Sequence, residues 1–119
     1  MIDMPSRNVD IVHIYDLLRQ LGVTANYTGF FHTSYAVYLA VQQQDRLLLV
    51  TKWLYPEVAR HYRTTWQCVE RNTRTVCEAA WVKNRSLLEQ LAKCRLPNRP
   101  TPAAFLAILA SYFNSGSAA

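Results

Sequence analysis

The sequence predicts an all-α fold of about six helices built around a helix-turn-helix. Apolar residues recur at the three- and four-residue spacing of amphipathic helices, and no segment alternates over a run long enough to require a strand. Within residues 54–83, two such segments are joined by a polar corner, and the small residue Ala59 stands ten positions before the β-branched Val69. This spacing is typical of two helices that cross steeply over a tight turn. We therefore expect a helix-turn-helix that the rest of the chain supports.

Two helices are predicted ahead of this motif. Residues 9–21 carry apolar side chains at helical spacing. Gly22 follows them, and we expect it to end the helix in the left-handed conformation that glycine readily adopts. Residues 30–41 form a more apolar segment, whose aromatic side chains we expect mainly in the core. Residues 46–53 include four consecutive aliphatic residues, which suit either a buried strand or a buried helix. Because no turn residues separate this run from the motif, we favour a helix joined to it.

The second helix of the motif is expected from about Thr65 to Lys83. Thr64 and Thr65 supply its N-cap, because a hydroxyl accepts hydrogen bonds from the unpaired N–H groups of a first turn. Helical spacing places these residues on its buried face: Val69, Thr73, Val76 and Ala80. It places these on the opposite, outer face: Gln67, Glu70, Arg71, Arg74 and Glu78.

Two further helices complete the prediction. Residues 84–95 form an amphipathic segment, with leucines 87, 88 and 91 facing inward. Thr101 is a second N-cap, and Pro102 occupies the first position of a last helix, where its missing N–H has no consequence. We expect one domain over residues 1–119, with flexible ends at residues 1–8 and 114–119.

The distribution of charge predicts a polyanionic partner. Residues 1–51 hold three basic and four acidic side chains, whereas residues 52–99 hold ten basic and four acidic ones. The excess positive charge thus lies in and just after the helix-turn-helix. Neutralisation of phosphates with release of counterions favours such clustering, although a basic face that is merely solvated is also common.

Several function classes are disfavoured. The sequence has no Gly-rich phosphate loop and no zinc-protease or serine-hydrolase motif, so we expect no enzyme. Glu57 and His61 are four residues apart and more often form a weak surface ion pair than a catalytic pair. The three cysteines and three histidines lack metal-ligand spacing, so we expect no metal, no cofactor and reduced thiols, with Cys77 in the core and Cys68 partly covered.

Targeting signals are likewise missing. No apolar run approaches the roughly 20 residues that span a bilayer. The N-terminus lacks the basic and then apolar start of a secretory signal. We therefore expect a cytoplasmic protein with no membrane partner.

A specific combination of residues surrounds the motif. In chain order it comprises TKWLYPEVA at 51–59, TT at 64–65, VER at 69–71, Arg74, and AW at 80–81. Matching residues continue outward with LGV at 21–23, GF at 29–30, PT at 100–101, Phe105 and Ala110. Over roughly residues 11–113, this combination resembles the C-terminal DNA-binding (effector) domain of the stage zero sporulation protein A response regulator family.

The resemblance implies a bacterial effector domain that binds short promoter elements in duplex DNA and contacts RNA polymerase beside the recognition helix. It implies a monomer in solution that pairs head to tail on DNA, and base readout by Glu70, Arg71 and Arg74. We assign contacts to the DNA backbone, or support of them, to Gln67, Thr65, Arg63, Arg60, Lys52 and Lys83.

Some features depart from the family pattern. Family members carry a phosphoacceptor receiver domain ahead of this one, so we expect either an excised effector domain or a stand-alone relative without that switch. Cys68, Asn72 and Thr73 also differ from the usual residues, and we expect the preferred DNA sequence to differ with them.

The sequence thus predicts a DNA-binding transcription regulator of the sporulation effector type. One alternative is a protein-interaction module that keeps the fold but no longer binds DNA, with a partner surface around Leu87 and Leu88. The presence of both Arg71 and Arg74 argues against it. A general RNA binder would need aromatic residues among the basic ones on an open surface, whereas the aromatic residues here stand mostly at core spacing.

Overall fold

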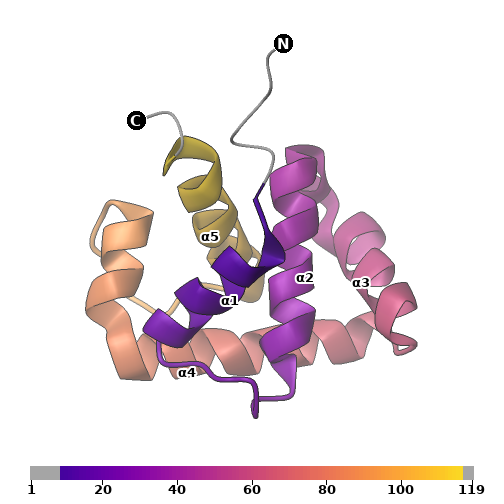
Figure 1. Cartoon of the computed structure of the whole chain (residues 1–119), viewed down its shortest axis with the longest axis horizontal. Helices are drawn as coiled ribbons and strands as arrows, with labels where there is room; N and C mark the ends of the chain where they lie inside the picture. Colours follow the sequence, from indigo (N-terminus) through magenta and orange to yellow (C-terminus); the bar gives the residue numbers. More distant parts are fainter. Residues whose placement is uncertain (1–8, 117–119) are drawn as a thin grey trace.

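Helix α2 is the centre of the structure. The computed structural model describes residues 9–116, and within them it contains five α-helices and no strand. The helices are α1 (Ile11–Gln20), α2 (Gly29–Gln42), α3 (Tyr55–Tyr62), α4 (Trp66–Ala92) and α5 (Pro102–Gly116). The long α4 runs along one side of the molecule, with α1, α2 and α5 above it and α3 beside α2 (Figure 1). The prediction of an all-α fold is therefore confirmed. The core forms around α2, because α2 packs against all four other α-helices.

The predicted stop after α1 is confirmed. Gly22 has a φ of +95°, and Val23 N–H donates to the carbonyl of Leu18, as in a helix that closes through a left-handed residue. A Cβ on Gly22 would lie 2.7 Å from the Cβ of Lys83, so a side chain does not fit there. The link between α1 and α2 therefore lies directly against α4.

The segment between α2 and α3 differs from the prediction. It is a 3₁₀-helix, η2 (Gln44–Leu49), followed by a π-helical turn, η3 (Val50–Leu54), and it exposes Leu48 by 80% and Leu49 by 52%. The expected helical character is present, but the expected burial was wrong. An unbroken aliphatic run has no period that would indicate which of its residues face the core.

Arg46 holds this segment in place. Its guanidinium donates to the carbonyl of Leu39 and to both carboxylate oxygens of Glu57, at 2.9 and 3.2 Å, and it is largely buried. The predicted surface pair of Glu57 with His61 was therefore wrong, because Glu57 binds Arg46 and the His61 ring stacks on Tyr35.

A kink at Asn84 explains the difference between six predicted and five observed helices. Asn84 has a non-helical φ of −153°, its side-chain oxygen accepts from Leu87 N–H, and its amide donates to the carbonyl of Gln20. Asn84 thus caps a new helical segment at the predicted boundary, although α4 continues through it. Leu88 and Leu91 of this segment are buried as predicted, and Leu87 is half-buried.

The aromatic residues of α2 are less buried than predicted. Phe30 is fully buried, but Phe31 is 41% exposed, and Tyr35 and Tyr38 are half-buried. Tyr35 and Tyr38 line an open groove together with residues of α1 and α3. At the start of α2, a Cβ on Gly29 would lie 2.7 Å from the carbonyl carbon of Asn72, so α2 rests directly on the backbone of α4.

The last helix begins as predicted and extends further. The hydroxyl of Thr101 accepts from Ala104 N–H, and α5 buries Phe105, Leu106, Leu109 and Ala110. It runs to Gly116, so residues 114–116, expected in a flexible tail, are helical. The other expected flexible residues, 1–8 and 117–119, lie outside the described part. No helix among the described residues has both the length and the apolar character needed to cross a bilayer.

Candidate nucleic-acid interface

Helices α3 and α4 form the predicted helix-turn-helix. α3 ends at Tyr62, and its C-cap Arg63 adopts the left-handed conformation (φ 57°, ψ 51°). Thr64 N–H donates to the carbonyl of Ala59 at 2.9 Å. Thr65 is extended, and its hydroxyl accepts from Cys68 N–H at 3.2 Å, which makes it the N-cap of α4 as predicted. Ala59 and Val69 are both buried where the two helices meet.

The two predicted faces of α4 are confirmed. Val69, Thr73, Val76 and Ala80 have no exposed surface. On the other side, Gln67, Arg71 and Arg74 are exposed, and Glu70 and Glu78 are partly exposed. The side chains of the outer face are therefore available to a partner that approaches α4.

Glu70 and Arg74 interact on this outer face. The carboxylate of Glu70 lies 3.7 Å from the Arg74 guanidinium, and the two side chains are 35% and 49% exposed. A pair this exposed contributes little to stability, but it limits the rotamers of Arg74. The structure therefore brings Glu70 and Arg74 together, with Arg71 one position from Glu70 on the same helix.

The other basic residues predicted to contact the DNA backbone near the motif lie in and around the turn. Arg60 in the last turn of α3 and Arg63 in the turn are exposed, as is Lys52 in η3. Within residues 9–116, none of these three forms an ion pair. Their charges are therefore not neutralised by nearby carboxylates.

Arg99, which was not among the predicted site residues, lies beside the outer face of α4. Its guanidinium is 3.3 Å from the carboxylate of Glu78, and the Cys77 thiol donates to the carbonyl of Pro100 at 3.2 Å. Cys77 and Glu78 of α4 thus contact Pro100 and Arg99 of the loop between α4 and α5. Burial raises the pKa of Cys77 to about 11, with Arg99 acting in the opposite direction, so the thiol remains a donor at neutral pH. No local pattern in the sequence signals this contact, because Arg99 is remote from Glu78 along the chain.

Lys83 lies apart from these residues. Its ammonium is 5.0 Å from the centre of the Tyr27 ring, and its side chain packs against Gly22. At about 100° per residue, Lys83 is roughly half a turn around α4 from Arg74. The structure therefore does not bring Lys83 together with the arginines of the outer face.

A family model matches most of the chain. Residues 14–113 match the model described as the sporulation initiation factor Spo0A C terminal. The chain belongs to this family. The match includes every predicted site residue, so the helix-turn-helix and the outer face of α4 both lie within the Spo0A C-terminal domain.

In this Spo0A C-terminal domain, a side-chain contact that the sequence did not predict also links α4 to α2. The side-chain amide of Asn72 lies 3.3 Å from His32 Nδ1 and 3.5 Å from the Cys68 sulfur. Burial lowers the pKa of His32, so the ring is neutral at pH 7. Asn72 and Cys68, two positions noted as departures from the family pattern, therefore interact with each other.

The thiols and acidic groups form no metal site in the described residues. Cys77 is buried and Cys68 is partly covered, as predicted, Cys94 is exposed, and all three are free. Among residues 9–116, no group of three or more His, Cys, Asp or Glu side chains is placed to hold a metal ion.

Proposed function

We propose that the chain is a bacterial transcription regulator of the sporulation effector type that binds a specific sequence of duplex DNA in the cytoplasm through the outer face of α4. The observation that carries the proposal is that α4 has one buried face and one exposed face. Its buried face fixes it on α2 and α3, and its exposed face carries Gln67, Arg71 and Arg74. Membership of the Spo0A C-terminal family supports the same function.

The dimensions of this face fit the major groove. An α-helix with its side chains is about 10–12 Å across, and the major groove of B-DNA is about 12 Å wide. Gln67 and Arg74 are seven residues apart, which spreads the exposed side chains over about 10 Å of the helix axis. Arginine donates two parallel hydrogen bonds to guanine O6 and N7, and a carboxylate accepts from cytosine N4. Arg71 and Arg74 are therefore assigned to guanines, and Glu70 both orients Arg74 and accepts from a neighbouring cytosine.

Residues around this face are assigned to the phosphates. Thr65 and Gln67 are at the start of α4, Arg60 and Arg63 border the turn, and Lys52 is in the preceding segment. Arg99 joins this group, because its contact with Glu78 places a further guanidinium beside α4. Each phosphate neutralised contributes about −0.9 to the slope of log K against log salt concentration.

Paired titrations separate base readout from phosphate contact. The preferred site is first selected from random duplex DNA, and each variant is then titrated with that site and with a scrambled duplex at the same salt concentration. Arg74→Ala is expected to weaken the selected site by about 1–3 kcal/mol and to affect scrambled DNA much less. Arg99→Gln is expected to weaken both duplexes alike and to reduce the salt slope by about 1.

Lys83→Ala is the matched control. It removes one positive charge from the same helix, at a position packed on Tyr27, and the ratio of specific to non-specific affinity is expected to remain unchanged. Equal proportional losses on both duplexes for Arg74→Ala would contradict its role in base readout. Absence of any binding that depends on salt would favour the alternative of a protein-interaction module with this fold.

The assembly of the domain is part of the same proposal and rests on the family. The domain is monomeric in solution, pairs head to tail on tandem sites and contacts RNA polymerase beside α4. Sedimentation with and without a tandem duplex tests the first two statements. A stable dimer that forms equally without DNA would contradict them.

A further inference from the structure

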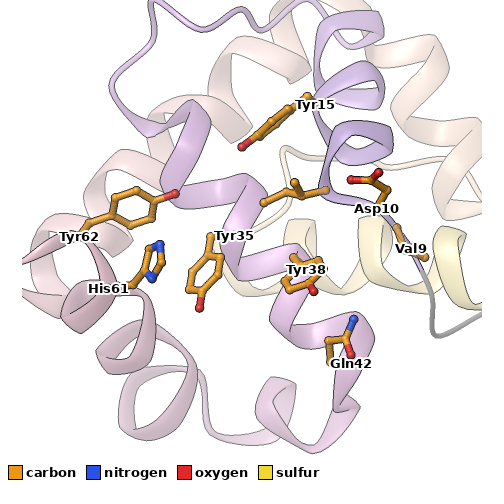
Figure 2. A pocket seen from close by; sticks show the side chains of 9 residues that line it. Val9, Asp10, Tyr15, Tyr35, Tyr38, Gln42, His61 and Tyr62 are labelled. Carbon is orange, nitrogen blue, oxygen red and sulfur yellow. The ribbon is translucent and has the colours of Figure 1, made fainter.

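A groove lined by aromatic residues lies away from the outer face of α4. Its volume is about 650 Å³, and it is formed by the start of α1, one face of α2 and the last turn of α3. Figure 2 shows the side chains of these three elements turned toward the same space. The lining residues are Val9, Asp10, Ile11, Tyr15, Tyr35, Tyr38, Gln42, His61 and Tyr62.

The rings of this groove are held in fixed positions relative to one another. The His61 ring stacks on Tyr35 with 4.2 Å between centroids and 21° between planes, and Tyr38 is nearly parallel to Tyr35 at 6.2 Å. Tyr62 meets both Tyr35 and His61 edge to face. On the opposite side, Tyr15 is held by Phe30 and Phe31, at 5.3 and 5.6 Å. The aromatic surface is thus formed before any ligand arrives.

The charge of the lining differs from that of the rest of the protein. Asp10 contributes a carboxylate, and within residues 9–116 no lysine or arginine lines the groove, although the chain has a net charge of +5. The hydroxyl oxygens of the tyrosines add partial negative charge. Burial, followed by the proximity of Tyr15 and Tyr35, raises the pKa of Tyr62, in agreement with phenol groups that lie close to one another.

We propose that this groove binds a small organic cation that has an alkylammonium or guanidinium head attached to an apolar chain or ring. Aromatic faces attract such cations through their quadrupoles, and the Asp10 carboxylate supplies the opposite charge. Inorganic anions and polynucleotides would find no lysine or arginine among the described residues that line the groove. The volume lies in the range of about 300–1,000 Å³ that is usual for small-molecule sites.

The position of the groove relates the ligand to the helix-turn-helix. His61 and Tyr62 belong to the last turn of α3, and the next residue is Arg63, in the turn itself. A bound cation would therefore contact the first helix of the motif without covering the outer face of α4. The proposal does not depend on DNA binding, and its test contains no DNA.

The test is a titration of the isotope-labelled chain with tetramethylammonium chloride, followed by aromatic NMR resonances. Sodium chloride at the same concentrations is the reference for ionic strength. Saturable shifts are expected for Tyr35, Tyr62 and His61 with the organic cation and not with sodium. Butyltrimethylammonium, which adds an apolar chain, is expected to bind more tightly than tetramethylammonium.

Three variants locate the site. Asp10→Asn removes the charge but keeps an oxygen that caps α1 and accepts from Val12 N–H, and it is expected to weaken binding by up to about fivefold. Tyr35→Leu keeps apolar contacts and removes the ring, with an expected loss of about two- to fivefold. Tyr112→Leu replaces an exposed tyrosine of α5 outside the groove and is expected to leave binding unchanged.

Three results would overturn the proposal. The first is the absence of saturable shifts, and the second is equal shifts with sodium. The third is saturable binding that Asp10→Asn and Tyr35→Leu leave intact. Asp10→Asn decides the outcome alone if Tyr35→Leu does not fold.

Discussion

Gly29→Ala tests the close approach of α2 to the backbone of α4. The added Cβ would lie 2.7 Å from the carbonyl carbon of Asn72 and 2.9 Å from a methyl group of Val76, and closer still to the carbonyl oxygen of Asn72. Ordinary contacts between carbon atoms are about 3.5–4.0 Å, so the helices would have to separate by about 0.8 Å or more. The obstacle is backbone, which cannot move aside as the end of a flexible side chain can.

The expected effect follows from two opposing contributions. Overpacking of a core typically costs about 1–3 kcal/mol. Replacing glycine by alanine in a helix gains up to about 1 kcal/mol. The net expectation is a loss of about 1–2 kcal/mol in the free energy of unfolding, which for a domain of this size lowers the melting temperature by roughly 4–8 °C.

Urea unfolding followed by far-ultraviolet circular dichroism measures this loss as a lower midpoint at an unchanged slope. Ala104→Gly is the matched control, because Ala104 is exposed in the first turn of α5 and reports the glycine–alanine difference without a close contact. It should lose about 0.5–1 kcal/mol. If Gly29→Ala unfolded at the same urea concentration as the unsubstituted chain, or at a higher one, the contact between α2 and the α4 backbone would be refuted.

Two further predictions concern the interior behind α4. The hydroxyl of Thr73 is fully buried without a hydrogen-bond partner, so Thr73→Val should raise the free energy of unfolding by about 1 kcal/mol. The control Thr75→Val, at an exposed position, should change it by less than about 0.5 kcal/mol. A lower free energy of unfolding for Thr73→Val would mean that the Thr73 hydroxyl has a hydrogen-bond partner. The pKa of His32 is lowered from 6.5 by burial, so the unfolded chain binds its proton more readily and stability should fall as the pH drops below 6.5. Urea midpoints across this range should fall less steeply for His32→Gln than for the control His13→Gln, and identical slopes would contradict the assignment.

Features fixed by neighbouring residues could be predicted from the sequence. Thr65 and Thr101 cap the helices that follow them because a cap requires only a hydroxyl and the next turn. The two faces of α4 followed from helical spacing, which placed Val69 inside and Arg74 outside. The positions of the predicted DNA-contacting residues around the turn are therefore largely local properties, whereas their roles on DNA remain predictions.

Features that depend on the path of a loop could not be predicted. Arg46 reaches Glu57, and Arg99 reaches Glu78, only because the intervening segments fold back. The aromatic groove combines residues from three helices, and its tyrosines have the spacing of core residues in the sequence. The aliphatic run at Leu48 and Leu49 carried no periodic signal, so its exposure was decided by the geometry of η2 and η3.

The division of α4 into two faces has a consequence for how such regulators diverge. Gln67, Arg71 and Arg74 have little part in packing, and the residues that hold the helix are hidden from a partner on the other side. Substitutions on the outer face should therefore cost little stability, whatever they do to binding. If the outer face reads DNA as proposed, promoter preference can change through a handful of exposed side chains while the fold stays the same.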